Sequence, residues 1–249
     1  MGGAHFALRQ YDKASTAFAR AMGDPAGKSP EPESEPEEAV YWTVRTFQIL
    51  ADQCFQRVEE LSPNSWRVHQ LRAEAYQQRQ ADDEAVKEYL LAIDLKPDEV
   101  ELHQSLGLIY LLDNAHEQAQ QAFEKAFELD RANPRTLYFL GRLFVAKQQH
   151  EESIPFLEAA LRLDPNLIEA RPSLGRAYFR VGRYKEAAVQ LEKGLALDYY
   201  GAIHYSLFQA HRRLGNMELA KKALDRSTEM RKTSFARDRG KFDRWIKSE

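Results

Sequence analysis

A pattern that returns every 34 residues constrains the fold of this chain more than any other feature. The sequence Leu-Gly-x-x-aromatic at residues 140–144 also occurs at 106–110 and at 174–178. Each copy is followed by a second amphipathic segment that ends near a joint such as Asp164-Pro165. A period of this length indicates one supersecondary unit that stacks on copies of itself and buries a shared core.

Each predicted unit contains two amphipathic helices joined by a short polar turn. Five units are expected, at residues 66–99, 100–133, 134–167, 168–200 and 201–231. Pro97, Pro134 and Pro165 lie at the joints, where a proline ends one helix or opens the next. The predicted fold class is all-α: a right-handed α-solenoid superhelix of stacked helix-turn-helix repeats.

Small and large residues alternate between the two helices of a unit in a way that predicts their packing. Gly107, Gly141 and Gly175 lie in the first helices, where a small residue lets two helix backbones approach closely. Large residues recur in the second helices and are expected to fill the gap to the next unit. Burying each of them contributes roughly 1.5–3 kcal/mol. These residues are Tyr89, Phe123, Leu157 and Leu191.

The pattern resembles the tetratricopeptide repeat over residues 66–231, and a chain built mainly from it is similar to bacterial proteins that consist of this repeat alone. The resemblance implies a non-catalytic array that binds a protein or peptide on the concave face formed by the first helices. The sequence departs from the family at a position usually held by a large aromatic or aliphatic residue. The five units have His69, His103, Leu137, Arg171 and His204 there.

Four segments flank the five units. Residues 1–22 have the spacing of a partial N-terminal repeat helix, and residues 23–36 are predicted to form a flexible, acidic, proline-rich linker. Residues 37–65 carry an apolar residue every three or four positions, which predicts a long helix that caps the first unit. Residues 232–249 form a basic tail with several aromatic residues. Capping of the last unit is its leading interpretation, and a basic–aromatic contact with a partner is the alternative.

Composition narrows the function classes. A net charge of -3 over 249 residues gives no overall attraction to nucleic acid or to an anionic membrane. The single cysteine, Cys54, excludes an intrachain disulfide and a cysteine-only metal site. No apolar run reaches the roughly 20 residues of a membrane span, and residues 1–10 lack the pattern of a signal peptide. We therefore expect a cytoplasmic protein, with a longer exported precursor as the alternative.

No pattern predicts catalysis, a metal site or a cofactor. His69, His103 and His204 recur at one position of the unit, and a repeated position forms a row along the stack instead of converging on one metal centre. The acidic run at 82–84 opens a helix, where carboxylates cap the backbone and favour the helix dipole. The sequence contains no glycine-rich phosphate loop and no nucleophile elbow.

The resemblance assigns a row of residues from successive first helices to the concave face. This row is polar in the first unit, apolar in the second and third, and basic towards the C-terminus. Its apolar members are expected to be exposed, which is typical of an interaction surface. Arg binds carboxylates bidentately, so we expect a partner with apolar side chains followed by acidic ones. The candidate site residues are Leu108, Leu111, Tyr138, Arg142, Val145, Arg176, Phe179, Arg180, Tyr205, Arg212 and Arg213, with Gln209 as a polar neighbour.

Three function hypotheses follow from these observations. The first is a non-catalytic scaffold that binds a peptide or protein segment on the concave face. The second is an assembly module that associates with itself or with a larger complex through its open N-terminal end. The third, an RNA-binding helical repeat, is disfavoured because phosphate contacts need a basic track.

The resemblance also gives an exclusion. Members that bind chaperones hold an acidic C-terminus with a clamp of Lys and Asn. The corresponding positions here are Gln70, Glu74, Ser105 and Arg142, so a chaperone adaptor is not expected.

Overall fold

The computed structural model describes residue 44 and residues 56–246, with side chains up to residue 234. Every regular element in these residues is helical, which confirms the all-α prediction. The chain divides into two compact units, Met1–Leu95 and Lys96–Glu249. The expected partial helix at 1–22, the linker at 23–36 and most of the capping helix at 37–65 lie outside the described residues.

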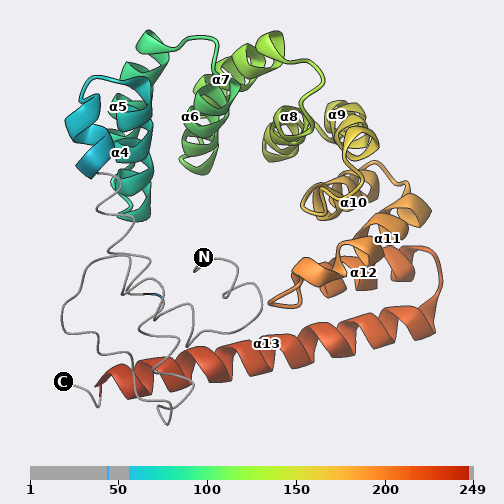
Figure 1. Cartoon of the computed structure of the whole chain (residues 1–249). Coiled ribbons are helices and arrows are strands. Elements are labelled where there is room, and N and C mark those ends of the chain that lie inside the picture. Colours follow the sequence, from blue (N-terminus) through green and yellow to red (C-terminus); the bar gives the residue numbers. More distant parts are fainter. Residues whose placement is uncertain (1–43, 45–55, 247–249) are drawn as a thin grey trace, which may run out of the picture. The chain divides into compact units, whose positions relative to one another are not determined.

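In its described residues the first unit contains one helical pair, α4 (Trp66–Gln78) and α5 (Asp82–Leu95) (Figure 1). Ser65 caps α4, because its side-chain oxygen accepts a hydrogen bond from the Val68 N–H at 3.3 Å. Tyr89 of α5 is buried, and its hydroxyl donates to the Gln77 side chain of α4 at 2.9 Å. Residues 56–61 are also helical and contact α4 through an ion pair between Glu59 and Arg72.

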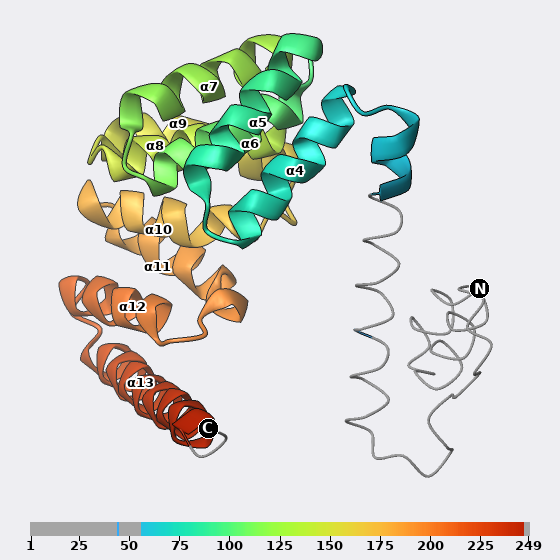
Figure 2. The same ribbon diagram turned by 90° about the vertical axis from the view of Figure 1, so that its left-hand side faces the viewer.

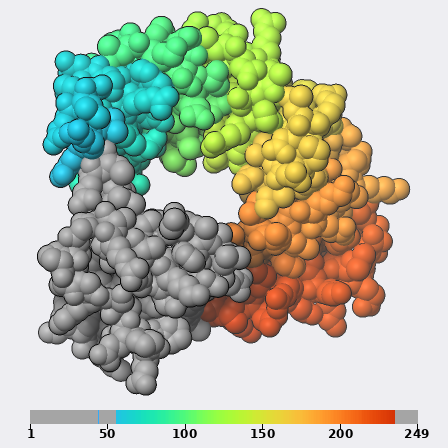
Figure 3. All heavy atoms as spheres, viewed as in Figure 1, coloured from blue at the N-terminus to red at the C-terminus, as the bar shows by residue number. Residues whose placement is uncertain are grey.

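The second unit stacks its helices in chain order, each packed against the one before it and the one after it (Figures 1 and 2). With all heavy atoms drawn, this stack is continuous from one pair to the next (Figure 3). Its elements are α6 (Val100–Leu112), α7 (His116–Leu129), α8 (Pro134–Ala146), α9 (His150–Leu163), α10 (Ala170–Arg180), α11 (Tyr184–Lys193), η1 (Leu195–Leu197), α12 (Ala202–Arg213) and α13 (Met217–Ile246).

A residue in the left-handed conformation follows every first helix. These residues recur at the 34-residue spacing, shortened by one before the last, and their φ values lie between 59° and 83°: Gln80, Asn114, Gln148, Gly182 and Gly215. The N–H of the next residue returns to a carbonyl of the first helix, as from Gln149 to Phe144 at 2.8 Å. This C-terminal cap joins the two helices of each pair with the same turn geometry.

The joint before α8 is held by side chains as well as by proline. Asn133 caps α8, because its side-chain oxygen accepts hydrogen bonds from the N–H groups of Arg135 and Thr136, both at 3.1 Å. The amide of Gln104 in α6 donates to that same oxygen at 3.0 Å and to the Thr136 hydroxyl oxygen at 2.7 Å. These bonds tie the first helices of two successive pairs together.

The fourth pair is less regular than the others. Its second helix, α11, has 10 residues where α9 has 14, and the 3-10 turn η1 replaces the missing turn. Asp198 follows η1 and is buried, where it accepts hydrogen bonds from the His204 N–H at 2.8 Å and from the His204 ring at 2.6 Å. The irregular joint is therefore fixed by polar contacts to the start of α12.

The last helix continues past the expected end of the fifth unit. Helix α13 runs for 30 residues, so the predicted boundary between a repeat at 201–231 and a tail at 232–249 lies inside one helix. No proline occurs between residues 217 and 246, so nothing interrupts the backbone hydrogen bonding. Among the described helices, none is long and apolar enough to cross a membrane.

Candidate functional site

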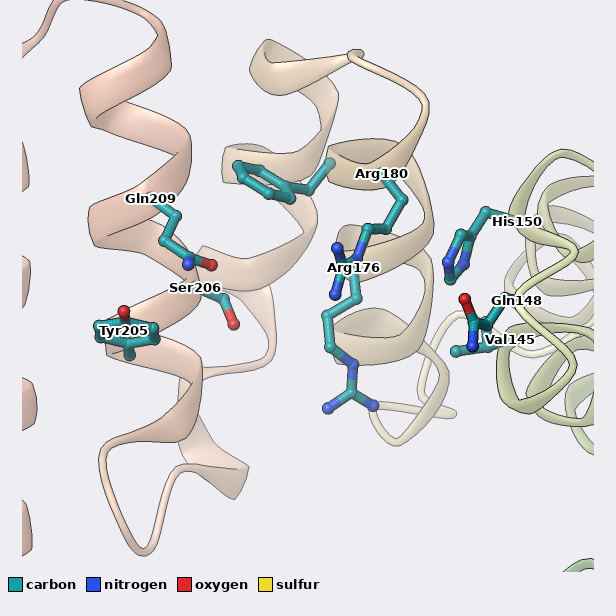
Figure 4. Close-up of a pocket in the computed structure, with 9 residues that line it drawn as sticks. Val145, Gln148, His150, Arg176, Arg180, Tyr205, Ser206 and Gln209 are labelled. Carbon is teal, nitrogen blue, oxygen red and sulfur yellow. The ribbon is translucent and has the colours of Figure 1, made fainter. Parts of the chain in front are cut away.

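A hollow of about 630 Å³ lies between the first helices of three successive pairs in the second unit. We call it the α10 hollow, because α10 supplies its centre (Figure 4). Figure 4 shows Arg176 and Arg180 in the space between α12 on one side and the α8–α9 turn on the other. The hollow is lined by Val145, Gln148, His150, Arg176, Phe179, Arg180, Tyr205, Ser206 and Gln209.

The two arginines of the α10 hollow have no carboxylate partner. Neither Arg176 nor Arg180 forms an ion pair with any residue in the described part of the chain, and no Asp or Glu lines the hollow. Arg176 retains contact with solvent, but partial loss of hydration lowers its pKa, and the nearby cation Arg142 lowers it further. An anion in the hollow would offset both effects.

His150 lies at the start of α9, on the wall opposite α12. Loss of hydration lowers the pKa of its imidazole, and the positive charge of Arg180 acts in the same direction. Its Nδ1 atom is buried without a hydrogen-bond partner in the described structure. Both effects favour the neutral ring, so the positive charge of the hollow comes from its arginines.

Two aromatic rings give the α10 hollow an apolar surface beside its charges. Phe179 is half-buried, and its ring centroid lies 5.4 Å from that of Tyr184. Tyr205 is 37% exposed and is flanked by Phe208, with 5.7 Å between ring centroids, and by the Arg231 guanidinium, 5.2 Å from its ring centroid. The packed neighbours limit the movement of both rings, which lowers the entropy lost when a ligand covers them.

Tyr138 and Arg142 lie on α8 beside the α10 hollow without lining it. The Arg142 guanidinium is 5.6 Å from the centroid of the Tyr138 ring, within the range of a cation–π contact. Burial raises the pKa of the Tyr138 hydroxyl, and the positive charge of Arg142 partly offsets this rise. The pair extends the basic and aromatic character of the hollow along α8.

The structure brings five of the eleven candidate residues together in the α10 hollow: Val145, Arg176, Phe179, Arg180 and Tyr205. The polar neighbour Gln209 lines it as well. Arg212 and Arg213 are exposed on α12 outside the hollow, and Arg212 lies over the Phe208 ring at 5.3 Å. The predicted row therefore overlaps with the lining of the hollow on α8, α10 and α12, and the remaining candidates lie outside it.

The expectation that Leu111 is exposed on the concave face is wrong. Its side chain is buried in a core cluster with Phe139 and Leu143 of the next pair, because α8 packs over this part of α6. Leu108 is half-buried against the same cluster. The apolar residues that α6 contributes to the predicted groove thus belong mainly to the core.

Three lining residues were not expected from the sequence. Gln148 belongs to the turn between α8 and α9, His150 is the first residue of α9, and Ser206 lies on α12 next to Tyr205 of the predicted row. The 34-residue register could have identified Gln148, because it occupies the left-handed position that recurs in every turn. Nothing in the sequence indicates that this particular turn borders a hollow.

The recurring histidines are engaged in local contacts. Nδ1 of His69 lies 2.7 Å from Glu88, Nε2 of His103 lies 2.8 Å from the Pro97 carbonyl, and His204 contacts Asp198. These residues fix first helices to a joint or to the paired second helix. No group of three or more His, Cys, Asp or Glu residues in the described part of the chain could hold a metal ion.

Comparison with known families gives two matches. Two family models, both described as tetratricopeptide repeat, match residues 110–171 and 173–234. The two matches cover α7 to α12 and parts of α6 and α13. No curated protein matches the chain significantly in sequence.

Solved structures of several proteins share the fold. A structure of YrrB, described as a TPR protein with an unusual peptide-binding site, is 22% identical, with a TM-score of 0.57 over 71% of this chain and 91% of YrrB. MamA from Desulfovibrio magneticus RS-1 is 18% identical, with a TM-score of 0.60 over 68% of this chain and 96% of that structure. A chain of the APC/C hetero-tetramer Cut9–Hcn1 is 18% identical, with a TM-score of 0.65 over 77% of this chain and 39% of its own length.

Proposed function

Because the chain belongs to the tetratricopeptide repeat family, we propose that it is a non-catalytic scaffold that binds a protein or peptide segment in the α10 hollow. The observation that carries this proposal is the proximity of two arginines without an acidic partner among the described residues, Arg176 and Arg180, to the half-buried ring of Phe179 and the exposed ring of Tyr205. All four side chains lie on the first helices α10 and α12. The surrounding pairs hold these helices in place through their buried cores.

The chemistry of the hollow defines the segment that it would bind. A carboxylate can accept two parallel hydrogen bonds from one guanidinium, and such a charge-assisted bond contributes about 1.5–3 kcal/mol. An apolar or aromatic side chain next to the acid would cover Phe179 or Tyr205. The Gln209 amide can bond the backbone of the segment, and the Ser206 hydroxyl, which donates to the Ala202 carbonyl at 3.1 Å, can still accept a hydrogen bond.

Two features support a segment over a compact ligand. The hollow is open on α8, α10 and α12 together, so a ligand can contact three helical pairs at once. The solved structure of YrrB, which has a similar fold, is described as having an unusual peptide-binding site, so peptides are the first ligand class to test.

Selection from a random peptide display library tests this proposal directly. The wild-type chain should enrich sequences that carry an acidic residue near an aromatic or aliphatic one. The variant Arg176→Gln/Arg180→Gln should lose this enrichment while keeping its helical circular dichroism. Selection of no motif by the wild type, or of the same motif by the variant, would contradict the proposal.

A matched control removes the same charge at another place. Arg162 of α9 and Lys185 of α11 are exposed, and neither lines the α10 hollow. The variant Arg162→Gln/Lys185→Gln should therefore select the same motif as the wild type. Its behaviour separates the effect of the hollow from that of net charge.

A further inference from the structure

Some cations of the described helices pair with a neighbouring glutamate, whereas the two arginines of the α10 hollow do not. Arg72, Lys125, Arg183 and Arg226 each lie within ion-pair distance of a glutamate. Arg176 and Arg180 have no such partner in the described part of the chain, although three helical pairs surround them. An acidic group from outside these helices is the missing complement.

The sequence itself contains a segment of matching composition. Residues 30–38 read Pro-Glu-Pro-Glu-Ser-Glu-Pro-Glu-Glu, with five glutamates, three prolines and no basic residue. From Glu31 to Glu37 the glutamates occur at every second position. The segment is therefore negatively charged, whereas the hollow is positively charged.

We propose that the α10 hollow of one molecule binds residues 30–38 of a second copy of this chain. This inference rests on the proposed function, because it uses the same hollow, and it names the partner as the chain itself. Every copy carries both the basic hollow and the acidic segment, so two copies can exchange segments in a closed dimer, or each copy can bind the next in a heterologous contact. Such contacts join molecules head to tail into rings or open chains.

The spacing of the charges supports this partner. Arg176 and Arg180 are four residues apart on α10, which separates them by about 6 Å along the helix axis. In an extended peptide, side chains two residues apart lie on one side and are about 6.5 Å apart. Two successive glutamates of the segment can therefore reach the two guanidinium groups at once.

The prolines supply the rest of the fit. Side chains alternate between the two sides of an extended segment, so the prolines lie on the side opposite the glutamates and leave them free to reach the arginines. Proline also restricts the backbone of the free segment, so less conformational entropy is lost when it binds. An acidic segment without prolines would have only the charge contribution.

Sedimentation velocity of the full chain, over a wide concentration range at low and high salt, tests the inference. The monomer mass is 28.7 kDa, and the wild type should show larger species whose fraction rises with concentration and falls with salt. Replacing Glu31, Glu33, Glu35 and Glu37 together by Gln should return the chain to the monomer. Arg176→Gln/Arg180→Gln should do the same, and Arg162→Gln/Lys185→Gln should associate like the wild type.

A labelled synthetic peptide of residues 29–39 gives a second readout on the glutamate variant, whose own segment no longer competes. The peptide should bind this variant, and a peptide of equal composition with its five glutamates in a row should bind at least tenfold more weakly. A wild type that is monomeric at every concentration, or association that survives in the glutamate variant, would overturn the inference. Either result would count only against residues 30–38 as the partner. The library selection tests the hollow itself, so it would still decide the proposed function separately.

Discussion

Gly141 of α8 lies directly against Leu157 of α9, so closely that a Cβ atom on the glycine would be 2.5 Å from the Leu157 Cγ atom. The same relationship occurs one repeat earlier between Gly107 and Phe123, and one repeat later between Gly175 and Leu191. Leu157 is fully buried, so it has no free space into which it could move. This contact sets the distance between the two helices of a pair, and its repetition sets the geometry of the stack that positions the α10 hollow.

Gly141→Ala should destabilise the second unit by about 1–3 kcal/mol, because the added methyl group overpacks a core that cannot expand without strain. Urea unfolding followed by circular dichroism measures this loss. The control is Gly141→Ala combined with Leu157→Ala, in which the shortened side chain makes room for the methyl group. The double variant should lose less stability than the sum of the two single variants, and strict additivity would contradict this account of the contact.

The Gln104 amide and the Thr136 hydroxyl form a buried polar pair that joins α6 to α8. Gln104→Leu should cost about 1–3 kcal/mol, because it leaves the Thr136 hydroxyl buried with one bond fewer. Combining Gln104→Leu with Thr136→Val should restore much of the lost stability, since neither side chain then requires a partner. Thermal unfolding of the three variants measures the effect, and a double variant as unstable as Gln104→Leu alone would argue against this role.

Two glycines with the same backbone conformation should respond differently to alanine. Gly182 and Gly201 have φ values of 83° and 78°. A Cβ atom added to Gly201 would lie 2.6 Å from the Ser227 carbonyl oxygen, whereas a Cβ atom added to Gly182 would meet no atom within 4 Å beyond its chain neighbours. Gly182→Ala should cost only the left-handed strain, about 1–2 kcal/mol. Gly201→Ala should lose clearly more, because the contact between α13 and the joint before α12 must open. Equal melting temperatures for the two variants would contradict the close approach of Ser227.

Asp198 should make stability depend on pH. Burial opposes ionisation of this carboxyl, but the hydrogen bonds from the backbone and ring of His204 outweigh it and hold its pKa below the ordinary value. An unfolded Asp has a pKa of about 3.9. Since the folded pKa is lower, the stabilisation is complete above roughly pH 5 and is lost as pH falls through the folded pKa.

Asp198→Asn should therefore destabilise the chain at neutral pH by about 1–3 kcal/mol and have a smaller effect in acid, where the wild-type carboxyl is also protonated. Unfolding of the variant and the wild type at several pH values measures the difference. Asp225→Asn is the control, because Asp225 is exposed on α13. A difference for Asp198→Asn that does not change with pH would show that the carboxylate charge is not responsible.

Much of the stack could be predicted from the sequence, because its period and its packing residues are local features. The Leu-Gly-x-x-aromatic pattern identified the first helices. Gly141 was expected to allow a close approach of two helix backbones, and Leu157 to fill the gap to the next unit. The short helix α11 was less accessible to prediction, since Gly194 and one missing residue signal an irregularity without specifying its form. The continuation of α13 to Ile246 depends on the absence of a helix-breaking residue. This signal is weak, and the basic composition after residue 231 favoured a separate tail instead.

The candidate site could be predicted only in part, because helix register predicts which side of a helix a residue faces but not how deeply neighbouring helices bury it. Arg176, Phe179 and Arg180 were expected on the concave face from the family resemblance and the helix register, and they line the α10 hollow. Leu111 has the same register on α6 but is buried, because the next helical pair covers it. The contribution of His150 depends on how a turn from one pair approaches the first helix of the next, which no local pattern encodes.

The affinity of one library-selected acidic peptide for three forms of the chain tests the central claim most directly. Isothermal titration should give Arg176→Gln/Arg180→Gln an affinity at least about tenfold weaker than that of the wild type, the loss expected from one or more charge-assisted hydrogen bonds. Arg162→Gln/Lys185→Gln, which removes equal charge outside the α10 hollow, should bind like the wild type. Equal affinities for all three forms would contradict the claim that the α10 hollow is the binding site.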